Sequence, residues 1–368
     1  MKLNLSSRFR RWILWGLKQG LQLWAKLRRR RFACDALAGA VRDGIFVNCD
    51  MTVSCNCQDV DGSGQLGSLR ENSLEDLLSG QTAGRFRREL AEGKLPVSRC
   101  PACFHLRLVP AAAAAARAGQ FRLPDGLSVE NTALCNLRCT GCCREELLRT
   151  RKHGRALGLD DVEIVAQTLA RLKATYCGYY NLGEPFLSRT IRRELEILRQ
   201  HNPQMEILIS TNGLLVDTDE KRKAALLADH VLFSIDGLDT PMVRRYQRGG
   251  DFDRAYENLR NLVRFRNERA LARPCIYWKY VVFRWNDRPA TIRRAIDLAR
   301  QAGVDCLQFT FARNPVGGIS WRFLLSPRFR SLGVGGGWRF RNVWFREPVE
   351  IGSHPRPPAA GHTEIQAA

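Results

Sequence analysis

The sequence predicts an α/β fold built on a parallel sheet, and two observations point to it. Between residues 121 and 314, segments with strand-like alternation and segments with helical periodicity alternate six times. With 45% hydrophobic residues, the 368-residue chain can also fill a sizeable core over about two domains. Strands joined through helices run parallel with right-handed crossovers, so the sheet is either open and doubly wound or curled into a full or partial barrel.

The expected elements follow one another in order along this region. The expected strands are 127–132, 176–181, 206–210, 231–235, 276–282 and 306–311. The expected helices are 160–172, 189–199, 219–228, 252–266 and 290–302. In both kinds of sheet, chemistry sits on loops at the carboxyl ends of the strands.

A basic helix is expected at the N-terminus. Residues 1–34 carry ten Lys or Arg and no acid. Apolar residues recur there at near-helical spacing: Ile13, Leu17, Leu21, Trp24 and Leu27. The pattern is typical of an amphipathic helix on an anionic membrane surface or on a partner, and equally of a helix that docks on its own protein with a solvated basic face.

A small cysteine-bearing α+β module is expected over residues 35–118. Residues 44–57 alternate like a strand pair, and a helix follows with a cap at Asn72 or Ser73. The alanine run 111–116 predicts a helical connector to the larger region.

The net charge of +21 is concentrated at the two ends of the chain. No zinc-finger, RNP or helix-turn-helix signature accompanies it, so nucleic acid is not an expected partner. Arg10-Arg11 is superficially similar to a twin-arginine signal, but Lys18, Lys26 and the arginines 28–31 interrupt any hydrophobic segment. No run approaches the roughly 18 apolar residues of a membrane span. We expect a cytoplasmic protein, with membrane contact through residues 1–34 as an open alternative.

The thirteen cysteines are bunched, and close-set thiols in a large chain more often bind metal than form disulfides. Cys135, Cys139 and Cys142, spaced CxxxCxxC, follow the first expected strand. Soft thiolates select zinc, copper(I) or iron–sulfur clusters. Structural zinc usually takes four protein ligands, whereas three ligands on a cubane cluster leave one iron open to another molecule.

This stretch resembles the radical S-adenosylmethionine (radical SAM) superfamily. Besides the motif CxxxCxxC, three further motifs follow later expected strands: Gly183-Glu184-Pro185, Ser210-Thr-Asn-Gly213 and Ser234-Ile-Asp-Gly237. The resemblance implies a partial (β/α)6 TIM-like barrel over residues 119–315. It also implies an enzyme, of unspecified subclass, that uses a [4Fe–4S] cluster to cleave S-adenosylmethionine to a 5′-deoxyadenosyl radical, which abstracts hydrogen from a substrate.

The resemblance assigns roles to individual residues. Cys135, Cys139 and Cys142 would hold the cluster. Gly183 and Glu184 would receive the ammonium group of S-adenosylmethionine, because a carboxylate pairs with an ammonium and glycine lets the backbone come close.

Further residues are matched less directly. Ser234 and Asp236 are candidates for a ribose or carboxylate contact, although both also fit an ordinary turn at Asp236-Gly237. Lys279 is a candidate on the fifth strand. Two positions depart from the family pattern: Gly141 stands where an aromatic residue is common, and Leu182 replaces the first glycine of GGEP.

The other cysteines divide into two groups. Cys143 next to the cluster motif is expected not to be a ligand. Cys177, Cys275 and Cys306 lie in apolar strands, where buried and inert thiols are the expectation.

A second metal site is expected in the module of residues 35–118. Cys55, Cys57, Cys100 and Cys103 supply four thiols, with Cys49 as an alternate, and four thiols can close a zinc site or a fully ligated iron–sulfur cluster. Residues 46–57, 67–80 and 100–103 resemble the auxiliary-cluster module called SPASM, or its shorter twitch form. That resemblance implies a second iron–sulfur cluster that relays an electron or holds substrate, in a module that here precedes the barrel instead of following it.

The resemblance also implies partners. They are S-adenosylmethionine, an electron donor such as flavodoxin or ferredoxin, and a substrate that is a peptide, a protein or a small molecule. Two alternatives remain: an iron–sulfur electron-transfer or cluster-carrier protein without S-adenosylmethionine chemistry, and a zinc-stabilised basic adaptor. Residues 316–368, rich in Gly and Pro, are expected to be disordered.

Overall fold

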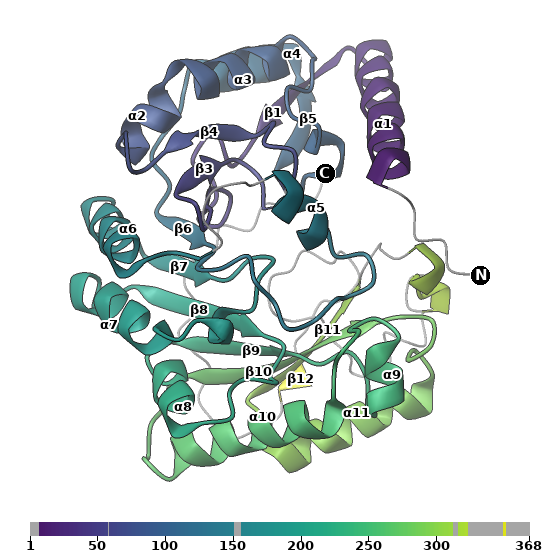
Figure 1. Cartoon of the computed structure of the whole chain (residues 1–368). Helices are drawn as coiled ribbons and strands as arrows, with labels where there is room; N and C mark the ends of the chain where they lie inside the picture. The colour runs from purple at the N-terminus through teal and green to yellow at the C-terminus, as the bar shows by residue number, and fades with distance from the viewer. Residues whose placement is uncertain (1–6, 58, 151–155, 312–315, 323–348, 351–368) are drawn as a thin grey trace.

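A ten-stranded, mostly parallel sheet forms the centre of the protein (Figure 1). The computed structural model describes residues 7–57, 59–150, 156–311, 316–322 and 349–350. The strands of the larger region are β6 (Gly126–Val129), β7 (Tyr176–Tyr179), β8 (Glu206–Thr211), β9 (His230–Ser234), β10 (Cys275–Val282) and β11 (Cys306–Phe311). These six lie side by side in sequence order, and each neighbouring pair is parallel.

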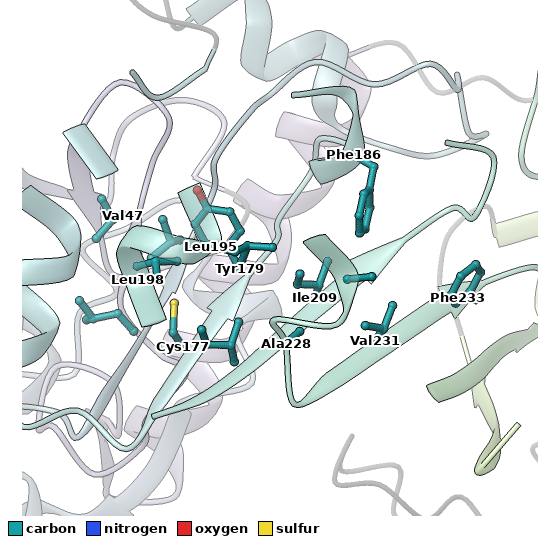
Figure 2. Packing of buried hydrophobic residues seen from close by; sticks show 14 of the residues in the cluster. Val47, Cys177, Tyr179, Phe186, Leu195, Leu198, Ile209, Ala228, Val231 and Phe233 are labelled. Atoms are coloured by element: carbon teal, nitrogen blue, oxygen red, sulfur yellow. The ribbon is translucent and has the colours of Figure 1, made fainter. Parts of the chain in front are cut away.

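Helices connect these strands and cover one face of the sheet. They are α6 (Leu159–Arg171), α7 (Ile191–His201), α8 (Asp219–Ala225), α10 (Phe252–Asn267) and α11 (Pro289–Ala302). Alternate strand residues, such as Cys177, Ile209 and Phe233, pack against Leu195 and Leu198 of α7 and the other helices in one apolar core (Figure 2). Strands joined in sequence order through helices on one face make an open barrel, and the predicted α/β class is confirmed.

The opposite face of the strands lines the inside of the open barrel. The intervening residues, which point there, form a separate apolar cluster of Tyr176, Leu208, Leu232, Tyr277 and Cys306. Towards the carboxyl ends the same face turns polar, because the next inward residues are Ser210, Ser234 and Lys279. The polar end of the barrel is therefore the end at which the strand-end motifs lie.

The module of residues 35–118 continues the barrel sheet. Its hairpin strands are β2 (Phe46–Val47), β3 (Thr52–Ser54) and β4 (Gln65–Ser68). Strand β2 pairs in parallel with β6, and the module shares the main apolar core. The module and the barrel are thus joined through backbone hydrogen bonds of one sheet.

Short elements surround this hairpin. They are the two-stranded pair β1 (Arg30–Cys34) and β5 (Leu106–Pro110), with α2 (Leu74–Ser79), α3 (Gln81–Ala91), η1 (Cys100–Ala102) and α4 (Ala111–Ala118). The side chain of Ser73 caps α2 by accepting from the N–H of Asp76, as one of the two caps predicted. Helix α1 (Ser7–Leu27) lies at the edge of the molecule beside this module (Figure 1).

The expected elements of the barrel are present, with ends that differ by a few residues. Short elements that the sequence did not predict also occur in the described chain, among them α5 (Arg144–Thr150), η2 (Pro185–Leu187), α9 (Thr240–Arg244) and η3 (Val316–Gly318). No helix in the described ranges has the length and apolar character needed to cross a bilayer.

The described chain continues past the boundary expected at residue 316. The hydroxyl of Ser320 donates to Asp287 Oδ2 at 2.6 Å, and β12 (Val349–Glu350) pairs antiparallel with β11. The rest of the expected tail, residues 323–348 and 351–368, lies outside the described residues.

Candidate functional site at the carboxyl ends of the strands

The loop after β6 carries Cys135, Cys139 and Cys142 together, all three half-buried. The loop is folded locally, because the N–H of Leu137 donates to Cys135 Sγ at 3.4 Å and the N–H of Cys142 donates to the carbonyl of Cys139 at 3.2 Å. The N–H groups of residues 138 and 140 bond to the carbonyls of residues 248 and 246 at 3.0 and 2.7 Å. The sequence prediction that the three thiols lie at a strand's carboxyl end agrees with this placement.

The three thiols influence one another electrostatically. Burial raises the pKa of Cys139 strongly, and the neighbouring Cys142 and Cys135 raise it further. Burial also raises the pKa of Cys135, to which Glu184 adds. A bound metal centre would reverse this preference, since a coordinating thiol is deprotonated.

Cys135, Cys139 and Cys142 suit an iron–sulfur cluster by the kind and number of their donor atoms. Among the described side chains, no group of three His, Cys, Asp or Glu is placed to hold a single metal ion. In a [4Fe–4S] cluster each thiolate binds a different iron, so the sulfurs need not converge on one point. Three neighbouring, half-buried thiols on one loop fit such a cluster with one iron left for another molecule.

Gly183 lies directly against the segment between β6 and the first cysteine. A Cβ at this position would lie 1.8 Å from the carbonyl oxygen of Thr132, so only glycine fits without a backbone shift. The adjacent N–H of Glu184 donates to the carbonyl of Leu134 at 2.8 Å. The segment predicted to approach the cofactor is therefore held against the cysteine loop.

The carboxylate of Glu184 connects this segment to the end of β8. Its oxygens accept from Thr211 Oγ1 at 2.7 Å, the N–H of Asn212 at 2.7 Å and the N–H of Phe186 at 3.2 Å. Burial raises the pKa of Glu184 to about 6, which these donors partly offset. A carboxylate has about four lone-pair sites, so capacity for a further donor remains.

Asn212 connects β8 back to the cysteine loop. Its Nδ2 donates to Asn136 Oδ1 at 2.8 Å and lies 4.0 Å from Cys135 Sγ. Gly213, next to it, has φ near +80°, a conformation that favours glycine. The Ser210-Thr-Asn-Gly213 motif therefore serves to bring a side-chain amide beside the first thiol.

Ser234 and Asp236 lie at the end of β9 in different environments. Ser234 faces the inside of the barrel, half-buried, with its Oγ 3.5 Å from Ser210 Oγ. Asp236 is buried, and its Oδ1 accepts from the N–H of Val281 at 2.8 Å. Burial raises the pKa of Asp236 to about 6, and the cation of Lys279 lowers it in part.

Tyr246 is a residue of the site that the sequence reasoning missed. It is half-buried, and its pKa is raised mainly by burial and then by the charge of the Cys139 thiol. Its ring lies 4.7 Å from that of Phe283, centroid to centroid. Gly141 leaves the loop without an aromatic residue, and Tyr246 brings one to it from the segment after α9, for which the sequence carries no motif.

Comparison with known proteins gives the family. Residues 129–271 match the model of the Radical SAM superfamily. Residues 129–271 are therefore a radical SAM domain. The resemblance to the radical SAM superfamily is confirmed for this range, which contains the cysteine loop and the three later motifs.

Curated relatives of the radical SAM domain are GTP 3′,8-cyclases. The chain is 26% identical over 141 residues to that of Alkaliphilus oremlandii, covering 38% of this chain and 43% of the relative. It is 28% identical over 140 residues to that of Pelotomaculum thermopropionicum, covering 37% and 42%. The chain therefore spans less than half the length of these relatives.

Among solved structures, Streptococcus suis SuiB bound to S-adenosylmethionine is similar with a TM-score of 0.41. The identity is 16%, and the similar part covers 52% of this chain and 42% of SuiB.

A second group of thiols lies in the module next to the radical SAM domain. One small cavity is lined by Cys34, Cys55, Cys100 and Cys103, with apolar residues and Asn56 around them. The pKa of Cys34 and of Cys100 is raised to about 12, chiefly by burial, and the thiols of Cys103 and Cys100 contribute to the raised value of Cys34. Four thiols from three separate segments thus surround one space.

This set differs from the four cysteines expected from the sequence. Cys34, for which the sequence predicted no role, takes part because β1 runs antiparallel to β5 just after the Cys100–Cys103 turn. Cys57 does not line the cavity; its neighbours include Cys103, Arg99 and Cys143. Cys49 packs with Cys143 in a small apolar cluster.

Proposed function

We propose that this protein is a radical SAM enzyme in which Cys135, Cys139 and Cys142 hold a [4Fe–4S] cluster. When bound, such a cluster supplies the electron that cleaves S-adenosylmethionine reductively to a 5′-deoxyadenosyl radical, which abstracts hydrogen from a substrate. The observation that supports this best is the placement of three thiols beside Gly183 and Glu184 at the polar end of an open barrel.

In this proposal Glu184 receives the ammonium group of S-adenosylmethionine. The buried carboxylate has one oxygen bonded to the N–H of Asn212 and keeps acceptor capacity for an ammonium hydrogen. Gly183 lets the backbone approach the cofactor, and Ser234 and Asp236 contact its ribose or carboxylate. Lys279 stays a weaker candidate in the same interior.

We also propose a second iron–sulfur cluster in the module of residues 35–118. The cavity favours Cys34, Cys55, Cys100 and Cys103 as its four ligands, in place of the set with Cys57. Four thiolates are the ligand set of structural zinc sites and of fully ligated iron–sulfur clusters, and the resemblance to the SPASM or twitch module favours iron–sulfur. The cluster would relay an electron or hold the substrate.

The substrate and the remaining partners are proposals of the same kind. The module resemblance favours a peptide or protein substrate, although family members with such a module also act on small molecules and sugars. The electron donor would be a flavodoxin or a ferredoxin in a cytoplasmic setting. The rival function is an iron–sulfur electron carrier, which would have no use for Glu184.

Anaerobic reconstitution with iron and sulfide tests the proposal. The reduced protein should produce 5′-deoxyadenosine from S-adenosylmethionine. The combined variant Cys135→Ala, Cys139→Ala, Cys142→Ala should produce none and keep about half of the bound iron, because the second cluster is separate.

The control is Cys275→Ala, which changes a thiol of an apolar strand. It should match the wild type in both iron content and product. A folded, iron-replete wild type that yields no 5′-deoxyadenosine would contradict the proposed enzymatic function and favour the rival function as an electron carrier.

A further inference from the structure

Helix α1 exposes an apolar face to solvent. The exposed fractions of Trp12, Leu23 and Leu27 are 66%, 60% and 73%. On an ideal helix these three positions fall within about 60° of one another, so they form one stripe along its length. Trp24 and Leu17, also exposed, widen the stripe on one side.

The opposite face of α1 attaches the helix to its own protein. Ala25 is buried, and Leu21 packs against the main core. Gln22 Oε1 accepts from the N–H of Leu95 at 2.9 Å. On an ideal helix Ala25 lies about 140° or more from Trp12, Leu23 and Leu27, so docking the helix leaves these three side chains uncovered.

This arrangement favours a helix with an outward binding surface over a helix that only docks on its own protein. A helix that only docks on its own protein would turn its apolar stripe inward and its charges outward. Here six of the eleven large apolar side chains exposed in the described part of the chain lie on α1. Exposed apolar area concentrated on one element marks an interaction surface.

Basic residues border the stripe. Lys26, Arg28, Arg29 and Arg30 are all exposed at its end, and no acid occurs in residues 1–34. The guanidinium of Arg28 lies 5.9 Å from the ring centroid of Trp24. A second copy of this helix would bring the same positive charges together, whereas an anionic surface would neutralise them.

We propose that the outer face of α1 binds the surface of an anionic lipid bilayer. The leucines and tryptophans enter the boundary between headgroups and acyl chains, where the indole N–H groups reach polar partners. The basic residues contact lipid phosphates. The helix lies in the plane of the interface and holds the thiol-bearing module at the membrane.

Co-flotation of the full-length reconstituted protein with vesicles tests this directly. The protein should float with phosphatidylcholine vesicles that contain phosphatidylglycerol, and should float weakly or not at all with phosphatidylcholine alone. High salt should release it. Brominated lipids should quench tryptophan fluorescence on binding.

Two variants separate the apolar and the charge contributions. Leu23→Ser with Leu27→Ser should weaken binding roughly tenfold or more, because two buried side chains are lost. Lys26→Gln with Arg28→Gln should weaken it at least about tenfold. The matched controls, Leu159→Ser with Leu271→Ser and Arg260→Gln with Arg264→Gln, alter exposed residues outside α1 and should bind like the wild type.

Membrane binding by α1 does not depend on the proposed function. Iron content and 5′-deoxyadenosine production in solution should be unchanged in the α1 variants. A fall in either quantity would show that the variant has not folded correctly. Equal binding to both kinds of vesicle, wild-type binding by Leu23→Ser with Leu27→Ser, or self-association through α1 without vesicle binding would each overturn it.

Discussion

At the scale of single residues, the candidate site depends on backbone contacts so close that a larger side chain would not fit. The carbonyl oxygen of Thr132 lies almost where a Cβ on Gly183 would be. The next residue, Glu184, places its carboxylate between two loops. Because Gly183 has no side chain, the two segments can meet, and Glu184 supplies the carboxylate. Both effects can be measured separately.

Gly183→Ala should lower the free energy of unfolding by about 2 kcal/mol, because the new methyl group overlaps a backbone oxygen. Thermal or urea unfolding measures the change. The matched control is Gly84→Ala inside α3, where the nearest neighbour is the flexible end of Arg88. That substitution should raise stability by up to about 1 kcal/mol, and a neutral Gly183→Ala would contradict the close approach.

The pH dependence of stability should reveal the buried carboxyl of Glu184. Burial raises its pKa from 4.5 to about 6, so between these values the folded state binds more protons than the unfolded state. Stability from this group is therefore present at low pH and is lost as pH rises through about 6. The loss amounts to about 2 kcal/mol.

Urea unfolding of wild type and Glu184→Gln, both iron-free, measures this effect. The stability of the wild type relative to the variant should fall by about 2 kcal/mol between pH 4.5 and 7. A difference that does not change with pH would show that burial does not shift this pKa.

At the scale of elements, α7 fixes how the strand ends stand relative to one another. Glu194 on α7 is buried and accepts from Asn131 Nδ2 at 3.0 Å and from the hydroxyls of Tyr179 and Thr190, both at 2.8 Å. It also accepts from the hydroxyl of Ser188. One helix carboxylate thus joins the end of β6, strand β7 and the segment after η2.

Glu194→Gln should destabilise the protein by about 2 kcal/mol. The amide group would turn a donor towards hydroxyl and amide donors and leave some of them unsatisfied in the interior. The control is Glu196→Gln on the same helix, whose exposed pair with Arg192 should contribute less than about 1 kcal/mol. Equal losses in both variants would refute the connecting role of Glu194.

At the scale of the whole molecule, the module and the barrel form one sheet. Strand β2 pairs with β6, the strand that leads into the cysteine loop. The cysteine cluster of the module and that of the loop therefore belong to one continuous sheet framework. The expected boundary near residue 118 therefore falls on a connecting helix between two parts that share backbone hydrogen bonds. A cysteine substitution at the second site should lower the metal content of that site before it disturbs the barrel.

The two candidate ligand sets of the module predict different outcomes. Cys34→Ser should remove the iron of the second cluster, about half of the total, and Cys57→Ser should retain it. Iron analysis and the spectrum of the reduced protein measure this. Cys275→Ser is the control, and loss of iron from Cys57→Ser but not from Cys34→Ser would restore the set read from the sequence.

The sequence by itself determined the order of the barrel elements and the motifs at their ends. Hydrophobic period is a local property, and β10 and α11 were therefore predicted within a few residues. The motif from Cys135 to Cys142 needs only short spacing on one loop, so it too was visible without the fold.

The tertiary structure alone decided which distant residues meet. Cys34 joins the thiols of Cys100 and Cys103 only through the pairing of β1 with β5, and Tyr246 reaches the cysteine loop only through backbone bonds made far along the chain. The direction in which α1 turns its apolar stripe is also set by packing. Local sequence fixes which residues share a face, but the contacts available around an element decide which face is covered.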